Sequence, residues 1–142
     1  MLTSKFSLTV AGSGATDVHD ITNEIRNELA RCGVEEGFIL LFTPGSTAAL
    51  TTIEFEPGVV ADLKDALGRL APEDMAYAHD QAWGDGNGYS HVRSALVGPS
   101  LTVAVEQGTL ALGTWQQIVV LDFDNRPRRR TVNGYIYNGV PA

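Results

Sequence analysis

The chain has 142 residues and a mass of 15.2 kDa, the usual size of one domain, and 44% of its residues are hydrophobic. We therefore predict a single domain over residues 1–142 with its own hydrophobic core. Its net charge of −7 and pI near 4.8 argue against nucleic acids and anionic membranes as general partners, because both attract basic surfaces.

Strands and helices alternate in the first part of the chain. Residues 6–10 alternate large apolar and small polar side chains and predict an early strand. Residues 20–33 predict an amphipathic helix, because Ile21, Ile25 and Leu29 recur at fourfold spacing.

A second pair of strands and a second helix follow. Residues 37–44 form a short apolar run that is typical of a buried strand. Residues 47–56 are rich in β-branched side chains and predict another strand. Residues 58–72 then carry one apolar residue per helical turn, and Pro72 ends the helix.

The C-terminal half predicts mostly strands. A short helix over residues 90–98 precedes strands over residues 100–108, 109–124 and 128–139, which glycine and asparagine turns separate. Early alternation followed by a run of strands indicates an α+β or mixed α/β domain with an antiparallel C-terminal half.

Two features bear on the compartment. The single cysteine, Cys32, excludes an intramolecular disulfide. The N-terminus lacks the apolar run of a signal peptide, and no stretch approaches the roughly 20 apolar residues of a membrane span. We expect a soluble, cytoplasmic protein.

The turn at Gly45, Ser46 and Thr47 follows a predicted strand and offers backbone N–H groups and two hydroxyls. Such donors can converge on the oxygens of a phosphate. An ordinary turn between strands has the same composition, so both interpretations stay open.

A polar stretch, residues 77–91, holds two of the three histidines, His79 and His91, with Asp80, Asp85 and Asn87 between them. Imidazole and carboxylate together can bind a divalent metal or act as a proton-transfer pair. The spacing matches no closed zinc pattern, so a solvated surface loop is the alternative.

Three further features allow either a structural or a functional role. Trp115 and Gln116 follow a Gly-Thr break, and the tryptophan can stack on a flat ring or belong to the core. The arginines in residues 126–130 can protect a sheet edge or bind phosphate. Glu54 and Glu56 are predicted to share one strand face, where they can bind metal or simply face solvent.

Taken in order, these segments resemble the YjbQ family, also called the secondary thiamine-phosphate synthase family, over nearly the whole chain. The most specific part is D-x-N-x-x-x-H followed by L-G-T-W-Q. Gly45 stands where many members have histidine. The segments that carry the resemblance are DIT (20–22), GSTAALTTIEFEPG (45–58), DL (62–63), YAHD (77–80), DGNGYSH (85–91), GTLALGTWQQI (108–118) and PRRR (127–130).

The resemblance implies a compact α+β domain, a mostly antiparallel sheet sandwich with two to three helices, assembled as a homotrimer. It also implies a weak transferase activity that joins a pyrimidine diphosphate to a thiazole phosphate and releases pyrophosphate. A non-catalytic metal- or anion-binding module and a structural subunit are the alternatives.

The same resemblance gives an expected site for a small phosphorylated molecule and a divalent metal, magnesium or zinc. The expected catalytic residues are His91, Asp85, Asn87 and Glu54, and the expected metal ligands are His79, His91 and Asp85. The expected substrate-binding residues are Gly45, Ser46, Thr47, Trp115, Gln116, Arg128 and Arg130.

Overall fold

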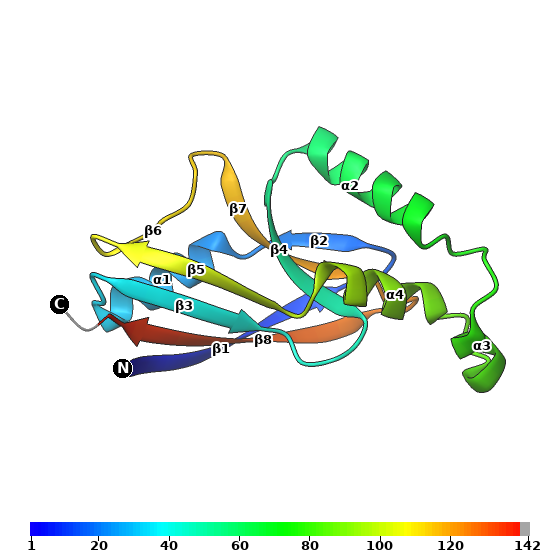
Figure 1. The fold of residues 1–142 in the computed structure, drawn as a ribbon, viewed down its shortest axis with the longest axis horizontal. Coiled ribbons are helices and arrows are strands. Elements are labelled where there is room, and N and C mark those ends of the chain that lie inside the picture. The colour runs from blue at the N-terminus through cyan, green and yellow to red at the C-terminus, as the bar shows by residue number, and fades with distance from the viewer. Residues whose placement is uncertain (140–142) are drawn as a thin grey trace.

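Two antiparallel sheets organise the chain in the computed structural model, which describes residues 1–139 (Figure 1). The larger sheet has five strands in the spatial order β1-β8-β3-β5-β6. Their bounds are Leu2–Gly12 (β1), Arg128–Asn138 (β8), Gly37–Phe42 (β3), Ser100–Glu106 (β5) and Thr109–Leu110 (β6). The two longest strands, β1 and β8, are neighbours, so segments from opposite ends of the chain form one side of this sheet.

The smaller sheet has three strands in the order β2-β7-β4. They span Asp17–Asp20 (β2), Gln116–Asp122 (β7) and Ala48–Glu54 (β4). The central strand β7 is apolar on both faces, because Ile118 and Val120 belong to the main core while Val119 and Leu121 belong to a second cluster. Burial on both faces explains why its sequence is continuously apolar rather than alternating.

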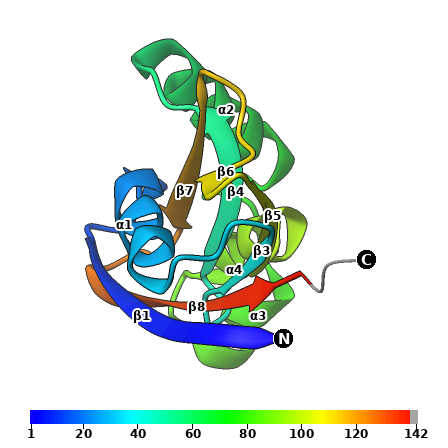
Figure 2. The ribbon, with the colours of Figure 1, turned by 90° about the vertical axis from the view of Figure 1, so that its left-hand side faces the viewer.

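Four helices complete the part of the chain that is described: α1 (Thr22–Cys32), α2 (Pro57–Leu70), α3 (Ala78–Trp83) and α4 (Gly88–Val97). Helix α1 contacts β1 and β6 of the larger sheet and β7 of the smaller one, and Figure 2 shows it between the two sheets. Helix α2 covers the other face of the smaller sheet through Leu67. Helix α4 packs beside β4. None of these helices, in residues 1–139, is long and apolar enough to cross a membrane.

The α+β class and the mostly antiparallel arrangement expected from the sequence are confirmed. The predicted helix over residues 20–33 is present as α1, with Ile21, Ile25 and Leu29 buried and Gly33 in a left-handed conformation after its end.

Two short elements were not expected. Strand β2 has the polar sequence Asp17–Asp20, and it is held by pairing with β7 rather than by apolar alternation. Helix α3 has only six residues and no buried side chain, so no apolar periodicity marks it.

The prediction that Glu54 and Glu56 share one strand face is wrong. Strand β4 ends at Glu54, and the side chain of Glu56 instead caps helix α2 by accepting hydrogen bonds from the backbone N–H groups of Gly58 and Val59. A carboxylate at this position satisfies donors that the first turn of a helix leaves free.

The outer face of the larger sheet carries aromatic side chains. Along β3, Ile39 and Leu41 are fully buried, whereas Phe38 and Phe42 point to the opposite face and are each 40% exposed. The ring of Phe38 stacks on Tyr137 of β8 with 4.8 Å between the ring centroids. This face therefore presents apolar surface that residues 1–139 leave exposed.

The close pairing of β1 with β8 gives a stability prediction. Gly134 lies opposite Phe6, and a Cβ atom on Gly134 would lie 2.0 Å from Cζ of the Phe6 ring. We expect Gly134→Ala to lower the free energy of unfolding in urea by about 1–3 kcal/mol, the usual cost of overpacking. Phe6→Leu in the same chain is expected to recover part of the loss.

Gly68→Ala is the matched control. Gly68 lies inside helix α2, and a Cβ atom there meets nothing within 4 Å. We expect this substitution to raise the free energy of unfolding by about 0.5–1 kcal/mol, because alanine loses less backbone entropy in a helix. Equal effects of the two substitutions would contradict the packing of Phe6 on Gly134.

Candidate functional site

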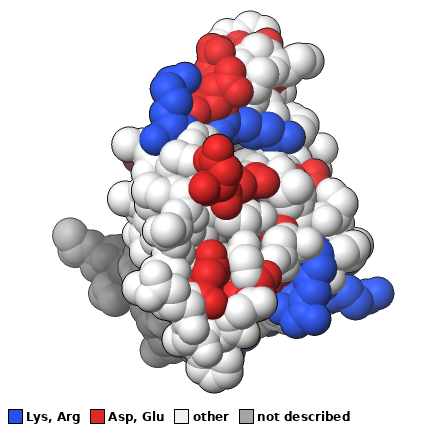
Figure 3. Space-filling model, turned by 90° about the vertical axis from the view of Figure 1, so that its right-hand side faces the viewer, with Lys and Arg blue, Asp and Glu red and all other residues white. Residues whose placement is uncertain are grey.

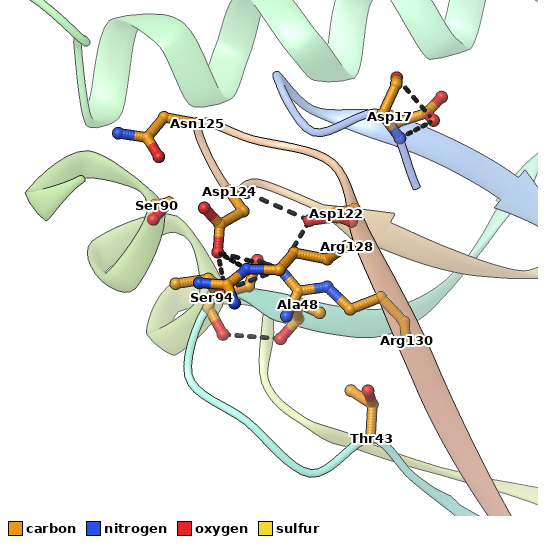
Figure 4. Close-up of polar contacts among 12 residues, drawn as sticks. Asp17, Thr43, Ala48, Ser90, Ser94, Asp122, Asp124, Asn125, Arg128 and Arg130 are labelled. Carbon is orange, nitrogen blue, oxygen red and sulfur yellow. Dashed lines mark hydrogen bonds and ion pairs between the residues drawn. The ribbon is translucent and has the colours of Figure 1, made fainter. Parts of the chain in front are cut away.

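Buried charges gather where strand β7 leads into strand β8. Asp122 is fully buried, and its Oδ1 accepts a hydrogen bond of 2.6 Å from Nη2 of Arg130, which is 8% exposed. The same Nη2 donates to Oγ1 of Thr47 at 2.7 Å. Figure 4 shows the side chains of Asp122, Asp124, Arg128 and Arg130 converging at this end of the smaller sheet.

Asp124 is the second buried carboxylate, 1% exposed. Its Oδ2 accepts hydrogen bonds of 3.0 Å from Thr47 Oγ1 and from Arg128 Nε. Burial by itself raises the pKa of Asp124. The hydrogen bonds from Arg128 and Thr47 and the positive charges of Arg128 and Arg130 outweigh that effect and hold the pKa below its ordinary value of 3.8.

Asn87 connects this charged group to the loop between α3 and α4. It is 5% exposed, and its Nδ2 lies 3.4 Å from Oδ1 of Asp124. Its Oδ1 accepts from Ser90 Oγ at 2.7 Å and from the backbone N–H of Asn125 at 3.2 Å. Asn125 Nδ2 in turn donates to the backbone oxygen of Asp85 at 2.7 Å. Two polar loops thus hold each other in place.

The glycines of this loop have a conformational role. Gly84 and Gly86 both have φ of +64°, which other residues rarely adopt. These two left-handed positions turn the chain between α3 and α4, so that Asp85 and Asn87 reach the same region. Gly84, Asp85 and Gly86 are exposed to solvent, whereas Asn87 and Gly88 are buried, so the stretch "GDGNG" runs from the surface into the interior.

His79, Asp80 and Asp85 form a compact cluster beside this loop. Nδ1 of His79 lies 3.4 Å from Oδ1 of Asp80 and 3.4 Å from Oδ1 of Asp85. One ligand atom from each of the three residues falls within 4.8 Å of the others. The ring of His91, on α4, lies 4.3 Å from that of His79 between centroids. Both predicted histidines are therefore brought together.

A cavity of about 300 Å³ opens between the two loops. Figure 3 shows this end of the molecule, where acidic side chains lie beside a basic group at one margin. The lining residues are Asp85, Asn87, Asp124, Asn125, Arg126 and Arg128. Carboxylates, amides and guanidinium groups thus surround one small polar space.

The predicted turn at Gly45, Ser46 and Thr47 lies next to the same charges. The backbone oxygen and Oγ1 of Thr47 both accept from Arg130. Nη1 of Arg130 lies 3.9 Å from the position that a Cβ atom on Gly45 would take. The turn is therefore adjacent to the buried arginine, and Ser46 is exposed beside it.

Glu54, Trp115 and Gln116 are not brought to this site within one chain. In the register of β4 with β7, Ala48 lies opposite Asp122, whereas Glu54 lies opposite Gln116. Six residues of strand separate the two ends, a distance of about 20 Å. Gln116 donates from Nε2 to Thr52 Oγ1, and Trp115 is 70% exposed at that far end.

The predicted site residues did not include Asp122, Asp124 or Asn125, and Asp80 was noted only as one of the acids between the two histidines. A signal for two of them was present, because Asp122 and Asp124 alternate with Phe123 directly after an apolar run. Acids at the end of a buried strand indicate a paired buried charge. Asn125 depends on contacts with Asn87 and Asp85, 38 and 40 residues away, which spacing does not encode.

Comparison with known proteins gives one family. A profile described as "UPF0047 protein YjbQ-like" matches residues 6–138. A UPF0047 protein of Archaeoglobus fulgidus is 38% identical over 127 residues, which cover 88% of this chain and 95% of the relative. 

Solved structures agree in fold. A YjbQ/UPF0047 family protein of Clostridium acetobutylicum, described as uncharacterized, has a TM-score of 0.85 at 32% identity and covers 93% of this chain and 99% of its own. A YbjQ-like protein from Sulfolobus solfataricus, described as of unknown function, has a TM-score of 0.86 at 24% identity and covers 96% and 99%. The second likeness shows the fold alone.

These findings correct the function expected from the sequence. The relatives are named only as UPF0047 proteins or described as of unknown function, and none of them is assigned thiamine-phosphate synthesis. The prediction that the chain joins a pyrimidine diphosphate to a thiazole phosphate is therefore wrong. The geometry gives a physical reason, since Trp115, expected to hold the pyrimidine ring, lies at the far end of the sheet.

The lowered pKa of Asp124 predicts how stability depends on pH. Because the folded state favours the ionised carboxylate, its stabilisation is present above pH 3.8 and is lost as the pH falls below that value. We expect Asp124→Asn to cost about 2 kcal/mol of unfolding free energy at pH 7, where charged hydrogen bonds are lost.

The measurement is urea unfolding of both proteins at several pH values between 7 and 3. The difference between wild type and variant is expected to shrink as the pH falls below 3.8. A difference that stays constant over the whole range would show that the ionised form of Asp124 contributes no stability.

Proposed function

This chain belongs to the UPF0047 YjbQ-like family, and from its own site we propose that it binds a divalent metal ion together with a small phosphorylated molecule. The proposal concerns the cavity of about 300 Å³ between the α3–α4 loop and the β7–β8 turn. One observation carries it. Asp85 belongs to the cluster with His79 and Asp80, and it also lines the cavity with Arg126 and Arg128.

The distances in the cluster support a metal ion. Nδ1 of His79 is 3.4 Å from an oxygen of each aspartate, which is long for a hydrogen bond. Two ligands of a tetrahedral zinc ion, each about 2.0–2.1 Å from the metal, lie about 3.4 Å apart. One nitrogen and two oxygens suit zinc, whereas magnesium prefers oxygen alone. The ring of His91 is tilted by 37° to that of His79, with 4.3 Å between the centroids, and packs against it.

Charge balance supports a phosphorylated partner. The carboxylates of Asp85 and Asp124 line the cavity, and by themselves they would repel an anion. A metal ion at Asp85 neutralises one of them, and Arg128 already pairs with Asp124. The side chain of Arg128 is 40% exposed, so its other N–H groups remain accessible to phosphate oxygens.

Bound metal would act as a Lewis acid on a phosphate oxygen or on a water molecule. The side chains of this chain would orient the ligand: Arg126 and Arg128 through their guanidinium groups, and Asn87 and Asn125 through their amide groups, all of which line the cavity. The site thus supports binding of a metal–phosphate pair whatever reaction follows.

Isothermal titration calorimetry on metal-free protein tests the two halves of the proposed site separately: the metal half, with His79, and the phosphate half, with Arg128. We expect His79→Ala to weaken zinc binding by more than about tenfold, since loss of even an indirect partner commonly costs that much. We expect Arg128→Gln to leave zinc affinity unchanged and to weaken the binding of inorganic phosphate by about tenfold.

Arg129→Gln is the matched control for Arg128→Gln. Arg129 is the next residue of β8, so its side chain points to the opposite face of the sheet, and it is exposed. The Arg129→Gln substitution removes the same charge as Arg128→Gln and is expected to leave phosphate affinity nearly unchanged. Equal losses in the two variants would sink the proposal of a specific phosphate site.

We further propose that the chain forms the trimer implied by the family resemblance, and that it does so through the outer face of its larger sheet. Phe38 and Phe42 are each 40% exposed there, and Tyr137 stacks on Phe38. Their cross-strand neighbours on β5, Ala104 and Ser100, are small and uncharged. Exposed aromatic side chains with small uncharged neighbours are typical of the centre of a protein interface, and the charged Lys5 lies over Tyr135 further along this face.

Analytical ultracentrifugation tests this proposal. We expect wild type to sediment with about three times the 15.2 kDa mass of one chain, and Phe38→Asp to sediment as a monomer. Leu70→Asp is the control, because Leu70 is 67% exposed on α2, away from this face. A monomeric wild type, or dissociation by Leu70→Asp alone, would overturn the assignment of the interface.

A further inference from the structure

The loop between β1 and β2 holds an unfavourable backbone conformation. Gly14, Ala15 and Thr16 have φ of +82°, +54° and +61°, three left-handed residues in succession. Two of them are not glycine, and side chains with a Cβ atom disfavour this region. Such a conformation persists only where surrounding contacts hold it.

This loop supports the backbone of Asp124. The N–H group of Ala15 donates to the backbone oxygen of Asp124 at 2.8 Å. Gly14 approaches the same oxygen so closely that a Cβ atom on it would lie 2.3 Å away. Because the carboxylate of Asp124 orients Arg128, a shift of the loop would reach the cavity through Asp124.

A buried arginine holds the loop in turn. Arg93, on α4, is 4% exposed, and its Nη1 donates to Oγ1 of Thr16 at 2.8 Å. Its Nε donates to the backbone oxygen of Ala71 at 3.0 Å, just after α2 ends. The ring of Tyr89 lies 4.7 Å from the guanidinium carbon, and Glu73 lies 3.5 Å from Nη1. Four neighbours thus hold the guanidinium in place: Thr16, Ala71, Tyr89 and Glu73.

We propose that Arg93 and Thr16 are positioning residues of the phosphate half of the site. The hydrogen bond between them keeps the loop in its left-handed conformation, and the loop fixes Asp124 and therefore Arg128. Arg93 follows His91 by two positions on α4, so the two side chains point in different directions and Arg93 does not contact the metal cluster. The inference rests on the proposed function of the same site.

Thr16→Val tests the proposal, because it keeps the shape of threonine and removes the hydroxyl acceptor. Thr16→Ser is the matched control that keeps the hydroxyl. The first readout is hydrogen exchange of the Ala15 amide, measured by NMR on protein without ligand. We expect exchange to rise about tenfold in Thr16→Val and to stay near wild type in Thr16→Ser, since a hydrogen bond to a charged group commonly contributes that much.

The amide of Val120, in the buried centre of β7, reports on global unfolding in the same spectra. We expect its exchange to be unchanged in both variants. Faster exchange of Val120 by the same factor as Ala15 would show a general loss of stability and would overturn the proposal. Unchanged exchange of the Ala15 amide in Thr16→Val would also overturn the proposal.

The second readout is titration with inorganic phosphate and with zinc. We expect Thr16→Val to weaken phosphate binding about threefold to tenfold, with zinc affinity unchanged and with Thr16→Ser restoring phosphate binding. Equal losses for zinc and phosphate would overturn a role confined to the phosphate half. If wild type binds no phosphate, the proposed function fails, while the exchange of Ala15 still decides whether Arg93 holds the loop.

Discussion

Nη2 of the buried Arg130 donates to Asp122 and to Thr47, and this one group joins β8, β7 and the turn before β4. A buried charge without a partner costs several kcal/mol. Packing these three segments together is therefore favourable only when the carboxylate of Asp122 contacts the guanidinium of Arg130. The pairing is incomplete, since Nε of Arg130 and Oδ2 of Asp122 have no partner among the atoms of residues 1–139. The position of Asp124 follows from the same meeting, because Thr47 donates to it.

Amide side chains connect these buried charges to the loop between α3 and α4. Asn87 is hydrogen-bonded to Asp124 and to the backbone of Asn125, and Asn125 is hydrogen-bonded to the backbone of Asp85. These bonds hold the loop that carries Asp85 against the sheet. Two residues of the cluster, His79 and Asp80, sit on α3, a helix of six residues with no buried side chain, and Asp85 follows that helix. The position of α3 therefore depends on its polar contacts, such as the hydrogen bond from the Gly88 N–H to Asp80, rather than on a hydrophobic face.

The sequence predicts well what depends on local patterns. Helix α1 follows from the fourfold spacing of Ile21, Ile25 and Leu29, and the left-handed Gly33 follows from helix-ending rules. The convergence of His79, His91, Asp85 and Asn87 also follows from a compact motif in a glycine-rich loop. In each case the residues that meet lie within a few turns of chain, so spacing carries the information.

Residue spacing does not predict which side chains come together when the pairing of distant strands determines their positions. Trp115 and Gln116 belong to a specific motif, yet pairing of β7 with β4 puts them at the end of the sheet away from Asp122. Strand β2 exists because β7 offers it a partner, and its own polar sequence gives no sign of that. Arg93 is similar, since its contacts with Thr16 and Ala71 join segments 77 and 22 residues apart.

Gly45 lies in a turn and is also close to Arg130, which comes from a distant strand. The family resemblance gives histidine at this position in many members, whereas this chain has a glycine with φ of +118°, a conformation that disfavours side chains. A Cβ atom there would contact Nη1 of Arg130 at 3.9 Å, so a larger side chain would cover the face of the guanidinium that points to the turn. With glycine, no side chain at position 45 contacts Nη1, and the next residue of the turn, Ser46, is exposed. The imidazole nitrogens near the cavity then come from His79 and His91 alone among residues 1–139, since His19 pairs with Asp17 on β2. Glycine at this position therefore leaves the turn without an imidazole nitrogen, next to a buried arginine.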